Sequence, residues 1–122
     1  MELQQLHKYL AAKPESIEDF PFGPEVSVYK VRGKMFALLT RRNGIWGMNL
    51  KCHPDEAVAL RDMFQCITTG YHMNKKHWIT VYFGEQEYGP LPPNGEIMRL
   101  IDNSFDLVVA TLPKKQRVAL LQ

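Results

Sequence analysis

The sequence predicts a two-layer α+β fold, in which helices cover one face of a single antiparallel sheet. Two observations favour this fold class. Residues 26–50 hold three apolar, β-rich runs in succession, and the last two are separated by Asn43-Gly44, the pair that a two-residue hairpin turn favours. Helix-like patterns precede this region, follow it and occur again near the end of the chain, which gives the order α-β-β-β-α-β-β-α.

Residues 2–13 predict a short amphipathic helix that ends before Pro14. Its apolar side consists of three leucines, Leu3, Leu6 and Leu10. Residues 14–24 contain three prolines, which indicate an ordered loop. We expect Phe20 and Phe22 of this loop to pack at the edge of the core, because aromatic rings bury a large apolar area.

The middle of the chain predicts a meander of three strands at residues 26–31, 35–40 and 45–50. Pro54 suits the first position of the helix that follows, and the two acids after it stabilise the positive end of that helix. We expect four apolar side chains to form the buried face of this helix, Ala57, Leu60, Phe64 and Ile67.

Residues 77–83 predict a further strand, for which residues 67–73 are a candidate antiparallel partner. The last helix begins at a predicted N-cap, Asn94, and ends before Pro113. Its buried face consists of Ile97, Leu100, Ile101, Ser104, Val108 and Thr111. We expect the Ser104 hydroxyl to bond back to its own helix.

The length of 122 residues and the hydrophobic content of 45% fit one domain over residues 1–122, since domains of about 100–150 residues are the commonest. The first residues lack a basic segment followed by an apolar run, and no window approaches the ~18 apolar residues of a membrane span. We therefore expect a cytoplasmic protein that does not insert into a membrane. Cys52 and Cys66 are expected to stay reduced and to pack as small apolar groups.

Basic and acidic residues occupy different segments, although the formal net charge is only +2. Residues 26–54 contain six basic residues and no acid, and residues 63–84 contain Lys75 and Lys76 without an acid. The acids lie in residues 1–25, 55–62 and 85–106. This separation predicts a fold with one positive side, which attracts polyanions. The alternative is that lysine and arginine at strand edges only discourage unwanted strand pairing.

The sequence contains no recognisable motif for a metal, a cofactor or catalysis. Structural zinc sites use closely spaced ligand pairs such as Cys-x2-Cys, and the candidate ligands do not form such a pair. These candidates are Cys52, His53, Cys66, His72 and His77. Ser104 lacks a Gly-x-Ser-x-Gly motif, and no glycine motif for phosphate or dinucleotide binding is present. We therefore expect no cofactor, no metal and no enzymatic activity.

Residues 70–81 concentrate ligand-contacting groups in a polar turn that leads into a strand. Three of these groups are predicted to contact the backbone or the bases of nucleic acid, Tyr71, His72 and Asn74. Six cations are predicted to contact phosphates, Lys75 and Lys76 in the turn and Arg32, Lys34, Arg41 and Arg42 at two hairpin tips. The alternative is structural, since the side chains of Asn74, His72 and His77 can also hold a long turn together through hydrogen bonds. Trp78 is expected in the core.

Several motifs of the chain recur in a known family of small bacterial proteins. They are Lys13-Pro14-Glu15, Tyr29-Lys30-Val31, Gly33-Lys34-Met35-Phe36-Ala37, Leu50-Lys51-Cys52, the segment 70–78 and Leu112-Pro113-Lys114-Lys115. With these motifs the chain resembles the MmcQ/YjbR family along nearly its whole length. The resemblance implies a two-layer α+β fold similar to that of frataxin and CyaY and of secretion chaperones. It also implies DNA binding through β-hairpins and a sheet face, in a "double wing" arrangement.

The sequence therefore predicts a protein that contacts double-stranded DNA through a basic surface of sheet and hairpins. The alternative is a module that binds a protein or a small ligand, as the chaperone likeness implies. A continuous positive face would favour DNA, whereas an apolar groove or a pocket beside residues 72–78 would favour the alternative.

Overall fold

The computed structural model describes residues 1–120. In chain order its helices and strands are α1 (Leu3–Ala11), β1 (Ile17–Asp19), β2 (Val26–Val31), β3 (Lys34–Arg42), β4 (Ile45–Lys51), α2 (Pro54–Met63), β5 (Ile67–Thr69), β6 (Trp78–Phe83), α3 (Glu85–Tyr88), α4 (Asn94–Val109) and α5 (Lys114–Leu120). The predicted order is present with three short additions, β1, α3 and α5. The sequence also predicts a short last turn at residues 118–121. Helix α5 contains residues 118–120 of this segment, and Leu121 lies outside the described residues.

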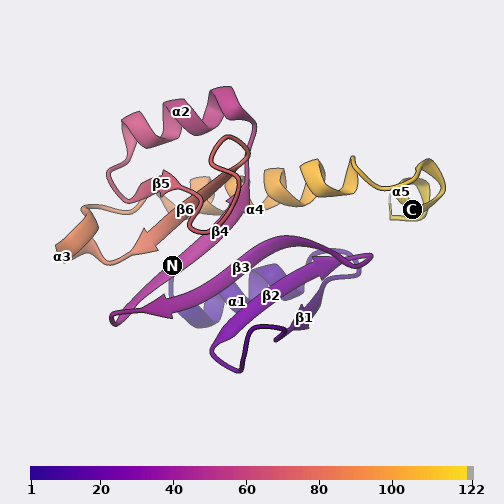
Figure 1. The fold of residues 1–122 in the computed structure, drawn as a ribbon, viewed down its shortest axis with the longest axis horizontal. Coiled ribbons are helices and arrows are strands. Elements are labelled where there is room, and N and C mark those ends of the chain that lie inside the picture. The colour runs from indigo at the N-terminus through magenta and orange to yellow at the C-terminus, as the bar shows by residue number, and fades with distance from the viewer. Residues whose placement is uncertain (121–122) are drawn as a thin grey trace.

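The strands form one antiparallel sheet in the order β1-β2-β3-β4-β6-β5, which confirms the predicted sheet and its central meander. Both meander turns are two-residue loops, Arg32-Gly33 and Asn43-Gly44. All four turn residues have positive φ, between 50° and 79°. This is the type I′ geometry, whose twist matches that of the flanking strands. The two turns lie at opposite ends of β3 (Figure 1).

Helices cover one face of the sheet, as predicted, and Figure 1 shows α1 and α4 behind the strands. Leu6 and Leu10 of α1 share one core with the apolar side chains of α4 and of the sheet. The core side chains of α4 that are least exposed are Ile97, Leu100 and Ile101. Removal of this apolar surface from water, at roughly 25 cal/mol per Å², holds the two layers together.

Helix α2 is shorter than predicted and ends at Met63. Phe64 is already extended, with φ −124° and ψ 118°, and Ile67 pairs with Val81 in the sheet. The two residues therefore do not belong to the buried face of the helix. The cause is local, since Ile67 opens a run of three β-branched residues that favours a strand over a helix.

Ser104 joins α4 to the sheet rather than to its own helix. Its hydroxyl donates to the Phe36 carbonyl at 2.6 Å and accepts the Lys51 N–H at 2.8 Å. The bonds lie just beyond the last pair of the β3–β4 ladder, Ala37 with Leu50. Ser104 is thus the hydrogen-bond partner of one backbone group of β3 and one of β4, at the point where these two strands separate.

The segment between α1 and β2 differs most from the prediction. Phe20 and Phe22 are 47% and 70% exposed, so the expectation that they pack at the core edge is wrong. Residues 17–19 form the edge strand β1, which leaves the next residues to cross the sheet face that carries no helix among residues 1–120. At the start of α4, Pro93 rather than Asn94 occupies the cap position.

Candidate functional site

The sheet face opposite α1 and α4 has a row of paired residues at its centre. The row consists of Val28, Leu38, Asn49 and Thr80, from β2, β3, β4 and β6. Side chains alternate between the two faces of a strand, so neighbours such as Leu39 and Met48 point to the helices and the row points away from them. Val28, Asn49 and Thr80 are nevertheless buried, which means that other segments cover this face.

One of these segments is the connection between β5 and β6, residues 70–77, which folds back over the row. The Tyr71 N–H donates to Thr80 Oγ1 at 3.0 Å, and the Thr80 hydroxyl donates to Asn49 Oδ1 at 2.7 Å. The Asn49 amide in turn donates to the Tyr71 carbonyl at 3.1 Å. The three bonds satisfy the buried polar groups of Asn49 and Thr80 and fix Tyr71 above β4 and β6.

Asn74 closes the turn within this connection. Its side-chain oxygen accepts hydrogen bonds from the backbone N–H groups of Lys76 and His77, at 2.9 Å and 3.3 Å. Lys75 and Lys76 are exposed beside it, and no ion pair among residues 1–120 includes either lysine. Trp78, which we expected in the core, is half-buried at the start of β6.

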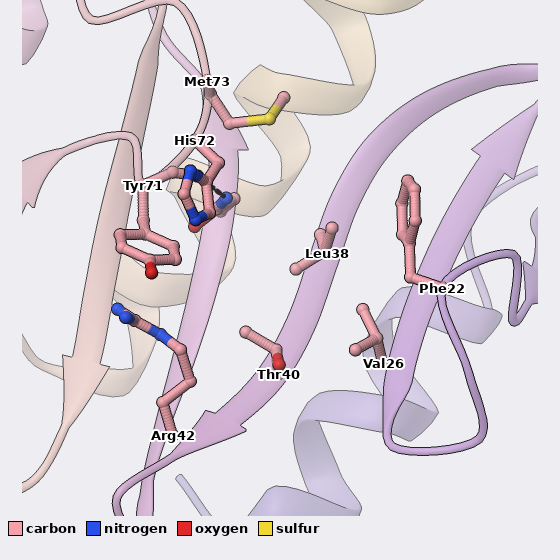
Figure 2. A pocket seen from close by; sticks show the side chains of 9 residues that line it. Phe22, Val26, Leu38, Thr40, Arg42, Tyr71, His72 and Met73 are labelled. Carbon is pink, nitrogen blue, oxygen red and sulfur yellow. Dashed lines mark hydrogen bonds between the residues drawn. The ribbon is translucent and has the colours of Figure 1, made fainter.

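A groove of about 360 Å³ crosses β3 on this open face, and we call it the sheet groove. Residues 71–73 form one wall, while Phe22 and Val26 lie on the other side (Figure 2). Leu38 and Thr40 of β3 lie between the walls and form the floor. The surface of the sheet groove is therefore mostly apolar and aromatic, with a few polar groups.

Arg42 lies at one end of the sheet groove, below the Tyr71 ring (Figure 2). Its Cζ atom is 3.3 Å from the centroid of that ring, a cation–π contact, and its Nη2 donates to the Tyr82 hydroxyl at 3.1 Å. Tyr82 stacks on Tyr88 of α3, with 4.3 Å between the ring centroids. The His72 ring lies against the Tyr71 ring, with 3.9 Å between the two ring centroids. A positioned guanidinium thus ends a largely apolar groove.

The structure brings together three of the residues predicted to bind nucleic acid, Arg42, Tyr71 and His72. Asn74, Lys75 and Lys76 follow in the same connection. Arg41 is exposed and borders a separate hollow with Trp46, because neighbouring residues of a strand point to opposite faces.

Arg32 and Lys34 lie apart from this group, at the other end of β3. Arg32 Nε pairs with Glu15 Oε1 at 2.7 Å, and Lys34 Nζ donates to Thr111 Oγ1 at 3.1 Å. The two basic hairpin tips therefore do not adjoin, and each cation of the first tip already has a partner in its own chain.

Sequence reasoning missed the apolar part of the sheet groove. The missed residues are Phe22, Val26, Leu38, Thr40, Asn49 and Met73. One signal was present in the sequence, since Asn49 is an amide inside a strand, a position where asparagine is rare unless it has a specific partner. The two walls of the groove, at residues 22–26 and 71–73, are more than forty residues apart in the chain, and no local pattern connects them.

The chemistry of the cysteines differs from that of reactive thiols. Cys52 and Cys66 are buried and free. Burial, helped by the nearby Glu56 carboxylate, raises the pKa of the Cys52 thiol to about 11, and burial also raises the pKa of Cys66. Both thiols are protonated at neutral pH and are weak nucleophiles. Among residues 1–120 no group of three or more His, Cys, Asp or Glu side chains is arranged to hold a metal ion.

The sequence of the chain matches a family model described as YjbR over residues 11–107, a region that includes the whole sheet and both walls of the sheet groove. The chain belongs to the YjbR family. The resemblance inferred from its motifs is therefore confirmed. YbdF of Escherichia coli O157:H7 is 40% identical over 121 residues, which cover 96% of this chain and 95% of YbdF.

More distant YjbR-family proteins are also similar over most of their length. YjbR of Escherichia coli K12 is 30% identical over 122 residues, which cover 100% of this chain and 99% of YjbR. YyaQ of Bacillus subtilis is 29% identical over 118 residues, or 85% of this chain and 95% of YyaQ.

Solved structures share the fold. A crystal structure of a Deinococcus radiodurans protein with a DUF419 domain has a TM-score of 0.84 and 32% identity, and covers 97% of this chain and 86% of that one. A crystal structure from Pseudomonas syringae has a TM-score of 0.72 and 34% identity, over 88% of this chain and 98% of that one. No helix among residues 1–120 is long and apolar enough to cross a membrane.

Proposed function

We propose that this YjbR-family protein is a non-enzymatic binding module that holds a small ligand in the sheet groove. The observation that carries the proposal is the groove itself, an apolar trough that adjoins Tyr71, His72 and Arg42. Sites for small molecules are concave, mostly apolar, commonly about 300–1,000 Å³ in volume, and contain a few polar groups that orient the ligand. The sheet groove has each of these properties, at the lower end of the volume range.

One wall of the sheet groove, residues 71–73, is held in place before any ligand arrives. Asn49 and Thr80 fasten Tyr71 to the sheet, and Asn74 closes the turn behind it. A ligand therefore binds without the cost of ordering a loop, which is the usual benefit of preorganisation. For a small aromatic probe of about twelve non-hydrogen atoms, a net binding free energy of about 0.3 kcal/mol per atom gives about 4 kcal/mol, which corresponds to a Kd on the order of 1 mM.

The experiment uses 2-naphthalenemethanol as a neutral apolar probe, titrated into ¹⁵N-labelled protein. We expect the amide signals of residues 71–73 and of Leu38 and Thr40 to shift with a Kd on the order of 1 mM. Leu38→Arg places a charged side chain on the groove floor and should weaken binding at least tenfold.

The matched control is Val58→Arg, at an exposed position of α2 that does not line the sheet groove. It should leave the Kd of the probe unchanged. If Leu38→Arg binds the probe as tightly as the parent, the ligand does not occupy the sheet groove and the proposal is wrong.

Double-stranded DNA is a second candidate ligand. The observation that favours it is the adjacent pair Lys75 and Lys76, which is exposed in the connection over the open face and has no acidic partner within ion-pair distance among residues 1–120. Lysines in such a position neutralise phosphates and release counterions, so binding weakens as salt is raised. Arg42, which is occupied by Tyr71 and Tyr82, adds to the positive charge on the same face.

The test is the salt dependence of affinity for a duplex of about 20 base pairs. If Lys75 and Lys76 contact phosphate, the double substitution Lys75→Ala/Lys76→Ala should reduce the slope of log Kd against log salt by about 2, one for each lysine. Lys114→Ala/Lys115→Ala, in the exposed first turn of α5, is the control of equal charge and should leave the slope unchanged. A parent slope near zero would exclude duplex DNA.

A further inference from the structure

We infer that the ligand of the sheet groove is a small monocarboxylate, whose apolar body lies between Phe22 and Tyr71 and whose charge is held by Arg42. The inference rests on the proposed function and adds the chemical class of the ligand. It follows from the position of Arg42 at the end of the groove (Figure 2), from the partners that hold this side chain, and from the lack of an aspartate or glutamate in the groove lining within residues 1–120.

The guanidinium of Arg42 is held in place by two aromatic side chains. It lies over the Tyr71 ring, with 3.3 Å between Cζ and the ring centroid, and the Tyr82 hydroxyl accepts one N–H at 3.1 Å. The stack of Tyr82 on Tyr88, with ring planes 10° apart, fixes that hydroxyl. The cation therefore has a defined orientation without a charged partner, and a ligand does not have to order it.

No acidic side chain within residues 1–120 forms an ion pair with Arg42. By contrast, Arg32 pairs with one glutamate and Arg99 with two. A guanidinium has five N–H donors, and the bond to Tyr82 uses one of them. The remaining donors suit the planar, two-point contact that arginine makes with a carboxylate.

The charge at the groove favours a single negative charge on the ligand. Arg42 is the one lysine or arginine that lines the sheet groove within residues 1–120, and no aspartate or glutamate lines it. A phosphate monoester carries close to two negative charges at neutral pH and is usually held by several cations or by a cluster of backbone N–H groups. A carboxylate needs one arginine. The apolar surface of Leu38, Val26 and Phe22 then accommodates the uncharged remainder of the molecule.

The decisive comparison is between two probes of nearly equal shape, 2-naphthoate and 2-naphthalenemethanol. We expect the parent protein to bind the carboxylate about tenfold more tightly than the alcohol, a difference of about 1.4 kcal/mol. In Arg42→Gln the ratio of the two affinities should fall to about one, whereas Arg42→Lys should keep part of the preference because it keeps the charge. Arg41→Gln removes the same charge from the adjacent, exposed residue and should leave the tenfold ratio unchanged.

The outcomes separate the inference from the proposed function. Binding of neither probe to the parent overturns both, while equal binding of the two probes overturns the carboxylate and leaves the groove as a neutral-ligand site. The parent comparison involves no substitution, so it holds even if Arg42→Gln disturbs Tyr71. An unfolded peptide with an apolar free C-terminus that binds more tightly than 2-naphthoate would assign the groove to protein termini and overturn the small-molecule ligand.

Discussion

Gly70→Ala is expected to lower the free energy of unfolding by about 2–3 kcal/mol and to abolish binding in the sheet groove. A methyl group at this position would lie 2.6 Å from Cβ of Trp78 and 3.1 Å from Cβ of Met73. The Gly70 N–H also donates to the Trp78 carbonyl at 2.8 Å, so the backbone cannot withdraw without breaking the first bond of the turn. The connection that carries Tyr71 should therefore shift away from the sheet.

Urea denaturation measures the free energy of unfolding, and titration with 2-naphthalenemethanol measures binding in the sheet groove. Gly95→Ala is the matched control, because a methyl group there meets nothing within 4 Å and the residue is in the first turn of α4. Alanine favours a helix over glycine, so this variant should be unchanged or more stable by up to about 1 kcal/mol. Equal stability of Gly70→Ala and the parent would show that the connection does not pack against β6 as described.

Asn49→Leu is expected to destabilise the protein by about 2 kcal/mol, although leucine is the more apolar residue for a buried position. Asn49 is 4% exposed and supplies partners to the Tyr71 carbonyl and to the Thr80 hydroxyl. Its removal leaves both groups without these bonds. The cost of a buried polar group without a partner is about 1–3 kcal/mol, which exceeds the gain from the added apolar surface.

A double-mutant cycle measures whether these residues act as one unit. Thr80→Val removes the hydroxyl that links Asn49 to the Tyr71 N–H. Either single substitution already breaks the hydrogen-bond network, so the second should cost less stability. The loss in free energy of unfolding for Asn49→Leu/Thr80→Val should therefore be smaller, by about 1 kcal/mol, than the sum of the losses for the two single substitutions. Additive effects would show that the two side chains stabilise the fold independently and do not jointly hold the connection.

The parts of the fold that the sequence predicts are those fixed by local chemistry. Asn43-Gly44 accepts positive φ at both positions, so the turn and the register of its two strands follow from two residues. In α4 the helical spacing of Ile97, Leu100 and Ile101 indicates the buried face without knowledge of the sheet. These signals give the class of fold and the order of its major elements.

The remaining features depend on contacts between distant segments. Residues 17–19 become a strand only because β2 offers a free edge. Phe22 then lies on the open face of the sheet and does not pack in the core. Ser104 was recognised as a polar residue on a buried helix face, but its partners, Phe36 and Lys51, are more than fifty residues away. Local patterns carry no information on such pairs.

The candidate site shows the same division. Residues 71–76 stand out in the sequence because their polar and aromatic groups are adjacent, and the structure places Tyr71 and His72 at the sheet groove. Arg41 and Arg42 look equivalent in the sequence, yet the alternation of β3 sends one to each face. The charge of Arg32 gives no sign of its pairing with Glu15.

An amide shift map of the ¹⁵N-labelled parent protein with 2-naphthalenemethanol locates the ligand without any substitution and so tests whether the sheet groove is the binding site. A ligand in the sheet groove should shift the amide signals of residues 71–73 on one wall, of Leu38 and Thr40 on the floor, and of Val26 on the other wall. Shifts centred on α2 or α5, or no shifts at concentrations well above about 1 mM, the Kd expected for a ligand of this size, would show that the sheet groove is not the binding site.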